Sequence, residues 1–117
     1  MREIIFYKTP NGDCPVEDFL DALQAKQAKK VTWVLKLVET LEMVPIQYFK
    51  KLDGTDGIWE VRVDFGSDTF RLLGFMFKGN LIVLTNAFTK KSPKTPASEI
   101  DLAEARRKDW LSRGNKK

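Results

Sequence analysis

The alternation of apolar and polar residues is clearest between residues 58 and 94. Three runs rich in β-branched and aromatic residues, at 58–65, 69–77 and 81–89, are separated by short turns that contain Gly66 and Gly79. Runs of this composition joined by glycine-containing turns are typical of an antiparallel meander. We therefore predict three consecutive strands that form the centre of the fold.

The alternation within the first run determines how it pairs with the second. A turn of two or four residues pairs Phe65 with Phe70 and Asp64 with Arg71, and it leaves Arg62 diagonal to Arg71. A three-residue turn would mix polar and apolar side chains on each face, so we reject that register. The accepted register predicts that Arg62 and Arg71 lie on the same face of adjacent strands.

The third run can pair with the second in two ways. A loop of two or four residues pairs Arg71 with Phe88 and brings Lys90 to the arginine face. A loop of three residues brings Ala87 and Lys91 there instead. Either register places one of the two adjacent lysines near Arg71, so we expect a cationic cluster at this end of the sheet.

The rest of the chain predicts one strand and three helices around the meander. Thr95 and Pro96 have the residue types of a helix cap and a first helical position. The expected fold class is α+β, in the order strand, helix, helix, three-stranded antiparallel meander, helix, with the helices packed on one sheet face in a single domain of residues 1–117. The elements outside the meander are a strand at 2–8 on the sheet edge or beside the meander, a helix from Pro15, a helix from about Lys26 to Met43, a loop at 44–57, a basic helix at about 96–112 and a frayed tail at 114–117.

Composition excludes several classes of protein. No apolar run approaches the roughly 18 residues of a membrane span, and the N-terminal segment lacks the pattern of a signal peptide. The single cysteine, Cys14, rules out an internal disulfide and fits a reducing, cytoplasmic location. The chain has no histidine, which removes the most common general base and zinc ligand.

The positive charge is concentrated at one end of the chain. The net charge is +4, yet residues 90–117 contain 9 Lys and Arg against 4 Asp and Glu, whereas residues 1–89 contain 11 against 12. A basic end beside a cationic sheet face suggests a polyanionic partner. The alternative interpretation is a basic end that only improves solubility.

The cationic cluster has a structural and a functional interpretation. Glu60 and Asp64 can hold Arg62 and Arg71 in cross-strand salt bridges. Such bridges do not account for the three lysines at 90, 91 and 94, whose mutual repulsion falls when an anion lies between them. The carboxylates lack the spacing of a metal site, so we predict a phosphate-binding site without a metal.

Several segments resemble a known family. The residues at 58–63, Ile-Trp-Glu-Val-Arg-Val, at 70–75, Phe-Arg-Leu-Leu-Gly-Phe, and at 86–96, Asn-Ala-Phe-Thr-Lys-Lys-Ser-Pro-Lys-Thr-Pro, precede an arginine-rich helix. These segments and the order of elements resemble the phage-derived HigB-like branch of the RelE/ParE type II toxin superfamily. The segment after the third run is the most specific part of this resemblance, which covers nearly the whole chain.

The resemblance implies a toxin that cuts mRNA in the ribosomal A site and inhibits translation. In this family the ribose 2′-hydroxyl attacks the adjacent phosphate and leaves a cyclic phosphate, without a metal or other cofactor. The implied partners are a HigA-like helix-turn-helix antitoxin, the ribosome and mRNA. The implied catalytic residues are Arg62, Arg71 and Lys90, with Glu60 and Asp64 as other candidates for the base. The residues expected to bind RNA are Lys50, Lys51, Phe88, Lys91, Lys94, Arg106 and Arg107.

Two departures from the family keep other functions open. Some RelE toxins use a C-terminal tyrosine, where this chain offers only Trp110, and Glu60 stands where some relatives have a basic residue. The alternatives are a ParE-like inhibitor of DNA gyrase and a non-catalytic module that binds nucleic acid or a protein partner.

Overall fold

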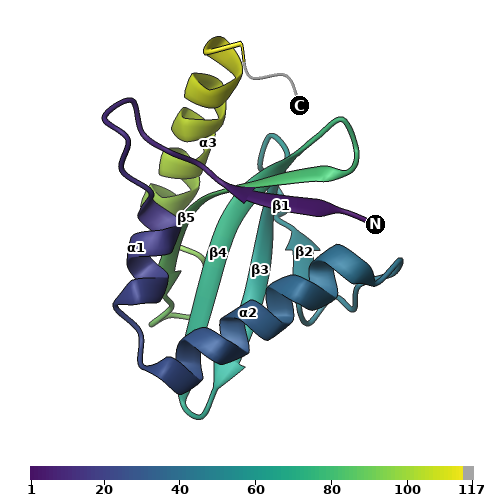
Figure 1. Cartoon of the computed structure of the whole chain (residues 1–117), viewed down its shortest axis with the longest axis vertical. Coiled ribbons are helices and arrows are strands. Elements are labelled where there is room, and N and C mark those ends of the chain that lie inside the picture. Colours follow the sequence, from purple (N-terminus) through teal and green to yellow (C-terminus); the bar gives the residue numbers. More distant parts are fainter. Residues whose placement is uncertain (115–117) are drawn as a thin grey trace.

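A five-stranded mixed sheet forms the middle layer of the molecule, and helices cover both of its faces (Figure 1). The computed structural model describes residues 1–114, and the expected frayed tail falls mostly on residues 115–117, outside this range. Among residues 1–114, no helix combines the length and apolar character that crossing a bilayer requires. The elements are β1 (Glu3–Phe6), α1 (Pro15–Asp21), α2 (Ala25–Thr40), β2 (Phe49–Lys51), β3 (Ile58–Phe65), β4 (Asp68–Phe77), β5 (Leu81–Thr89) and α3 (Ala97–Ser112).

The strand order β1-β5-β4-β3-β2 confirms the meander and adds one strand to it. β1 lies at one edge of the sheet, one of the two positions expected for the N-terminal strand, and it runs parallel to β5. The prediction of a loop throughout residues 44–57 is wrong, because β2 pairs with β3 at the other edge. β2 is only three residues long and depends on tertiary contacts, since buried Phe49 stacks on Trp59 with 4.6 Å between ring centroids.

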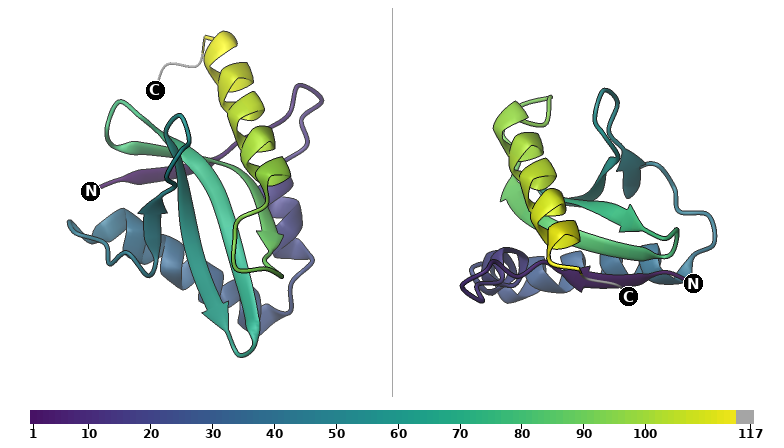
Figure 2. Two further views of the ribbon diagram at one scale, coloured as in Figure 1. Left: turned by 180° about the vertical axis from the view of Figure 1, so that it is seen from behind. Right: turned by 90° about the horizontal axis from the view of Figure 1, so that it is seen from above.

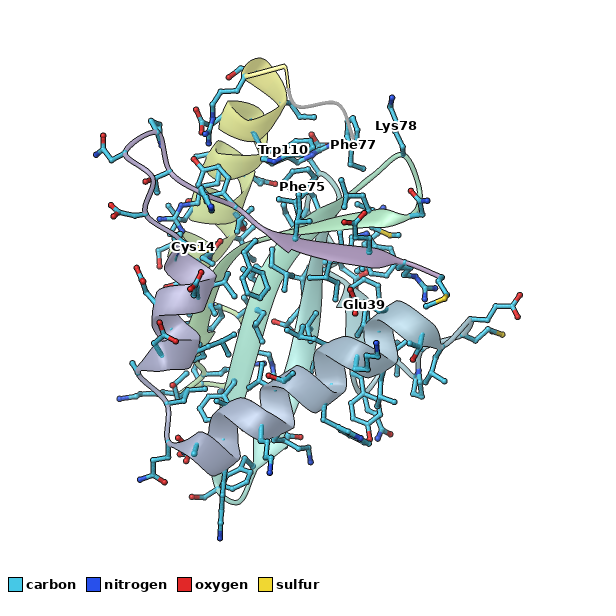
Figure 3. All side chains as sticks on the ribbon, viewed as in Figure 1. Cys14, Glu39, Phe75, Phe77, Lys78 and Trp110 are labelled. Atoms are coloured by element: carbon cyan, nitrogen blue, oxygen red, sulfur yellow. The ribbon has the colours of Figure 1, made fainter. Side chains whose placement is uncertain are left out.

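The helices do not share one sheet face, which corrects the predicted arrangement. α1 and α2 cover one face, whereas α3 lies on the other, as the view from above shows (Figure 2, right). The cause lies in β4, where apolar side chains point to both faces and both therefore need cover. Phe75 and Phe77 meet Trp110 of α3 in edge-to-face contacts (Figure 3).

The β3–β4 hairpin has a register two residues away from the predicted one. Its turn is formed by residues 66–67, so Phe65 pairs with Asp68 and Arg62 lies directly opposite Arg71. Gly66 has a φ of 61°, a left-handed conformation that glycine adopts without steric cost and that fixes the position of the turn. A slip of two residues preserves the faces, so the shared face of the two arginines is confirmed.

The β4–β5 pairing combines both registers that the sequence left open. The loop comprises three residues, 78–80, and Phe77 pairs with Leu81. A β-bulge after Leu73 then shifts the register, so that Arg71 nevertheless lies opposite Phe88. The two strands approach so closely at this bulge that a Cβ on Gly74 would lie 2.2 Å from the Val83 carbonyl oxygen. The bulge therefore sets which residues of β5 lie beside the arginines.

Two helix ends differ from the prediction for identifiable reasons. α2 ends at Thr40 rather than Met43, where the Arg2 guanidinium donates to the carbonyl oxygens of Val38 and Leu41 at 3.2 and 2.6 Å. α3 begins after Pro96 without a side-chain cap. The expected capping role of Thr95 is wrong, because its hydroxyl is engaged elsewhere, as described below.

Candidate functional site

The charged residues of β3 and β4 lie at the hairpin end of the face that carries α3. The helix covers the opposite half of this face, where Ala103 packs with Ile58 and Leu73. Toward the turn, the same face presents Arg62 and Arg71, which lie opposite each other. We call these two residues the arginine pair.

Arg71 is a buried cation with few partners. The residue is 8% exposed, and its Nη1 donates to the Phe70 carbonyl oxygen at 3.0 Å. Its Nε lies 3.6 Å from Glu60 Oε1 and has no hydrogen-bond partner within residues 1–114, while its Nη1 lies 3.7 Å from Asp64 Oδ1. Burial lowers the pKa of Arg71, against the opposing effect of Glu60, but an arginine keeps its proton in proteins. The result is a fixed and poorly solvated positive charge.

Glu60 provides the buried negative charge of the cluster. Its side chain is 0% exposed, and Oε1 accepts a hydrogen bond from Arg62 Nε at 3.0 Å. Its other oxygen, Oε2, accepts a hydrogen bond of 2.5 Å from the Thr95 hydroxyl. The expectation that the acids of this region are ion-paired is therefore confirmed for Glu60, and for Asp64 through Arg71. Buried charges of opposite sign compensate each other when they are also hydrogen-bonded.

Lys90 follows the end of β5 and faces the same cluster. Its backbone N–H donates to the Thr69 carbonyl oxygen at 2.7 Å, which extends the ladder beyond the strand. Burial and the positive charge of Arg71 lower the pKa of Lys90, and Glu60 partly opposes this effect. A lysine with a lowered pKa has a larger neutral fraction at a given pH and is therefore a better proton acceptor.

An open hollow of about 580 Å³ lies beside Arg71 and Lys90. Its walls come from the β3–β4 turn and from the segment after β5, which runs beside the sheet before α3 begins (Figure 2, left). Arginine, lysine and hydroxyl donors in one hollow suit a phosphate group. The lining residues are Ser67, Asp68, Thr69, Arg71, Thr89, Lys90, Lys91, Ser92 and Pro93.

The residues expected to bind RNA are dispersed. Lys91 lines the hollow, and exposed Lys94 lies in the same segment. Lys50 and Lys51 lie on the edge strand β2, beside a separate hollow that Trp59 also lines. The structure thus brings the lysines at 90 and 91 to the hollow. Of the β2 lysines, Lys50 lies opposite Glu60 on the face of the arginine pair, and Lys51 lies opposite Trp59 on the other face.

The aromatic residues near the arginines pack under α3. Phe88 is partly buried against Ile58 and Leu73. Phe75 is 1% exposed and contacts Trp110, so it has no free face on which a base could stack. Phe75 is therefore unavailable to a base, and the expected role of Phe88 in RNA binding stays a prediction.

Arg106 and Arg107 attach α3 to the rest of the molecule. Arg106 Nη1 donates to the Thr85 carbonyl oxygen at 2.8 Å, and its guanidinium lies over the Tyr7 ring. Arg107 donates to the Asp56 carbonyl oxygen and lies 3.5 Å from the Asp56 carboxylate. These contacts are away from the arginine pair, so the structure does not bring these two residues to the hollow.

Thr95 and the hydroxyl residues of the hollow are absent from the sequence-based site. Thr95 lies 35 positions from Glu60 in the chain, and its residue type indicated only a helix cap. Nothing in the alternation of the strands distinguishes Ser67, Thr69 or Ser92 from ordinary turn residues. Within residues 1–114, no group of three or more His, Cys, Asp or Glu side chains could hold a metal ion.

Comparison with known proteins identifies a family. No curated protein matches the chain. Residues 18–108 match the family described as phage derived protein Gp49-like (DUF891). The matched region begins in α1, ends in α3 and includes the arginine pair, Glu60 and the whole segment after β5. It covers about three quarters of the sequence, so the chain belongs to the phage-derived Gp49-like family.

Proposed function

We propose that this protein is the toxin of a type II toxin–antitoxin system and that it cleaves mRNA on the ribosome. The observation that carries the proposal is an open hollow lined by Arg71 and Lys90, with Arg62 directly opposite Arg71 and a lowered pKa at Lys90. Membership of the Gp49-like family supports it, because this family is associated with RelE-like toxins. The HigB-like branch is the assignment that the sequence resemblance favours.

The arrangement suits a transphosphorylation that needs no metal ion. Lys90 in its neutral form accepts the proton of the ribose 2′-hydroxyl, whose oxygen attacks the adjacent phosphorus. Arg71 and Arg62 stabilise the charge that develops on the phosphate oxygens. The bond to the 5′-oxygen of the next nucleotide then breaks, and this oxygen takes a proton from solvent. The products are a 2′,3′-cyclic phosphate and a 5′-hydroxyl.

Lys90 is a better candidate for the base than either carboxylate. Both oxygens of Glu60 accept hydrogen bonds, and its side chain is 0% exposed, so the 2′-hydroxyl cannot reach it. The Asp64 side chain is 75% exposed and lies beside Arg71 at the rim of the site. Lys90 lines the hollow, and its pKa is lowered by burial and by the charge of Arg71, which enlarges the neutral fraction that can accept a proton.

The proposed partners follow from the same chemistry. The part of the chain after β5 is basic, because residues 90–117 contain 9 Lys and Arg but only 4 Asp and Glu. This positive charge attracts the phosphate backbone of mRNA and of ribosomal RNA. A toxin of this kind is held inactive by its cognate antitoxin, for which we propose a HigA-like helix-turn-helix protein.

The test is induced expression without an antitoxin, followed by mapping of transcript 5′ ends. Wild type should arrest growth and produce cuts inside translated codons, whereas Lys90→Gln and Arg62→Gln should produce neither. Lys29→Gln, which removes an exposed lysine of α2 outside the site, is the matched control and should behave as wild type.

Two outcomes would contradict the proposed mRNA cleavage. Growth arrest with intact transcripts and damaged DNA would indicate an inhibitor of gyrase. Neither arrest nor cleavage, together with binding of RNA or a protein partner, would indicate a non-catalytic module.

A further inference from the structure

The two acidic residues that face the arginine pair from β3 are in opposite environments. Side chains two positions apart along a strand lie on the same face, and β3 in this way places Glu60, Arg62 and Asp64 together. The Glu60 side chain is 0% exposed and the Asp64 side chain is 75% exposed. Both carry the same charge and both lie within 4 Å of Arg71, yet only Glu60 is fixed by its surroundings.

The contacts of Glu60 orient the arginine pair. Glu60 Oε1 accepts a hydrogen bond from Arg62 Nε at 3.0 Å and forms an ion pair with Arg71, whose Nε lies 3.6 Å away, so one oxygen lies between both guanidinium groups. The terminal nitrogens of Arg62 have no hydrogen-bond partner among residues 1–114, and this side chain is 29% exposed. The arginine fork is thereby left free to bind an anion, and bidentate binding is the strongest mode for phosphate.

The second oxygen of Glu60 reaches a distant part of the chain. It accepts the Thr95 hydroxyl hydrogen bond, and Thr95 lies at the end of the segment that carries Lys91 and Lys94. This bond connects that segment to β3, and the segment forms one wall of the hollow. Glu60 thus contacts the arginine pair through one oxygen and the segment after β5 through the other.

We propose that Glu60 is a positioning residue that assembles the arginine pair and the segment after β5 into one phosphate site, while Asp64 is a displaceable counter-ion of Arg71. The identification of the anion as an RNA phosphate rests on the proposed function, but the positioning role does not. Glu60 itself takes no proton and touches no reacting atom.

A role of Glu60 in neutralising charge and a role in positioning the arginines predict opposite effects of its removal on anion binding. If Glu60 only neutralised a buried arginine, its removal would increase the positive potential and strengthen anion binding. If it positions the cations, its removal weakens anion binding despite the gain in positive charge. Asp64→Asn removes the same charge from the same strand face and therefore shows the effect of charge alone.

The experiment measures phosphate binding by Glu60→Gln, Asp64→Asn and Thr95→Val. Inorganic phosphate is titrated while the Nε–H signals of Arg62 and Arg71 are followed by NMR, and a 2′-O-methyl RNA hexamer is titrated in parallel because it cannot be cleaved. We expect Glu60→Gln to raise the dissociation constants for phosphate and for the RNA hexamer roughly tenfold, the size typical of one hydrogen bond to a charged group. Asp64→Asn should lower both, and Thr95→Val should raise both with the Arg62 Nε–H signal unchanged.

Tighter binding by Glu60→Gln, equal to that of Asp64→Asn, would overturn the proposal. If Glu60→Gln does not fold, Thr95→Val decides, because it leaves all three charges in place, and unchanged phosphate binding in that variant would also overturn it. Failure of the proposed function is recognised separately, since a wild-type protein that does not cut mRNA still shows the opposite effects of Glu60→Gln and Asp64→Asn on phosphate.

Discussion

At the scale of single residues, the site concentrates buried charge that does not favour folding. Arg71 is 8% exposed, its Nε has no hydrogen bond to any residue in the described range 1–114, and burial lowers the pKa of Lys90. Groups of this kind cost stability, and they persist where binding or catalysis requires them. Substitutions in this cluster should therefore separate function from stability.

Lys90→Gln should abolish cleavage and raise the midpoint of thermal unfolding at pH 7. The pKa of Lys90 in the folded protein is lowered from its ordinary value of 10.5, so at neutral pH the amine is charged in both states and the folded state bears the cost of that charge. This cost disappears only above pH 10.5. The midpoint is measured by circular dichroism, with Lys91→Gln as the control. A lower midpoint for Lys90→Gln would contradict the prediction.

The pH dependence of cleavage should reveal the same group. The single-turnover rate of wild type on a ribosome-bound message should rise with pH and level off below 10.5, as Lys90 loses its proton. In Lys90→Arg the rise should vanish together with most of the activity, because arginine keeps its proton. A wild-type rate that does not change with pH would remove Lys90 from the role of base.

Arg71→Lys should reduce cleavage strongly while the protein still folds. A lysine retains the positive charge beside Glu60, so the buried carboxylate keeps a counter-charge, but the fork that binds phosphate in two places is lost. Alanine is a poorer test, because breaking a buried ion pair costs roughly 3–5 kcal/mol. Cleavage by Arg71→Lys is compared with that by wild type at equal folded fractions, and full activity would contradict a bidentate role.

The alternation of polar and apolar residues along the strands predicted those parts of the site that depend on local sequence. Arg62 and Arg71 could be placed on one face because side chains alternate strictly along a strand. The contact between Glu60 and Thr95 could not be predicted, because it joins residues 35 positions apart and depends on the path of the loop before α3. The register was missed by two residues, since only the conformation of Gly66 determines where the turn begins.

At the scale of the elements, the arginine face depends on how β4 and β5 meet and on how α3 is held. The order of elements followed from apolar periodicity and turn residues. The position of α3 did not, because its periodicity shows that one side is apolar but not which sheet face that side covers. The strand β2 was not predicted, because two of its three residues are lysines and the sequence does not show that Phe49 is buried.

Gly74→Ala should destabilise the protein by roughly 3 kcal/mol, near the upper end of what overpacking usually costs. The added Cβ would lie 2.2 Å from the Val83 carbonyl oxygen, and backbone cannot move aside as a flexible side chain can. Urea denaturation measures the loss. Ser67→Ala, on an exposed turn, should stay within about 0.5 kcal/mol of wild type. If Gly74→Ala were equally mild, the close approach of the strands at the bulge would be wrong.

Tyr7→Phe should lower the unfolding midpoint and flatten its dependence on pH. The Tyr7 hydroxyl donates to Asp109 Oδ2 at 2.5 Å, which ties α3 to the chain after β1. Burial, followed by this hydrogen bond, raises the pKa of Tyr7 from 10.0, and the hydrogen bond lowers the pKa of Asp109 from 3.8.

The signs of these shifts define a window of stability. The contribution of Tyr7 is present below pH 10.0 and is lost as the pH rises through its raised pKa. That of Asp109 is present above pH 3.8 and is lost as the pH falls through its lowered pKa. Thermal unfolding across this range should show both losses in wild type and in the control Tyr48→Phe, and smaller ones in Tyr7→Phe. Identical pH profiles for all three proteins would argue against a stabilising hydrogen bond between Tyr7 and Asp109.

At the scale of the whole molecule, charge is divided between a nearly neutral body and a basic end. The division is visible in composition, so the class of partner could be predicted from the sequence, whereas its geometry required the fold. The segment after β5 carries Lys91 and Lys94 past the arginine pair, and the arginines of α3 turn back toward Tyr7 and Asp56.

The double variant Lys91→Gln, Lys94→Gln should make RNA binding less sensitive to salt. Each phosphate contact to single-stranded RNA contributes about 0.7 to the slope of log K against log salt. Loss of two contacts should therefore reduce the slope by about 1.4. The slope is measured by fluorescence anisotropy with the 2′-O-methyl hexamer. The double variant Lys29→Gln, Lys36→Gln, on exposed positions of α2, should leave it unchanged, and equal slopes for both double variants would contradict a path for RNA along this segment.

The pairing of β1 with β5 has a consequence for the order in which the protein is made. Glu3 leaves the ribosome early but pairs with Leu81, and Glu60 must wait for Thr95. Bringing such distant segments together is slow, because the loop between them must close first. A nascent chain therefore lacks the β1–β5 pairing until residues 81–84 have emerged and the Glu60–Thr95 contact until residue 95 has emerged. A protein that attacks translation would in this way spare the ribosome that is still synthesising it.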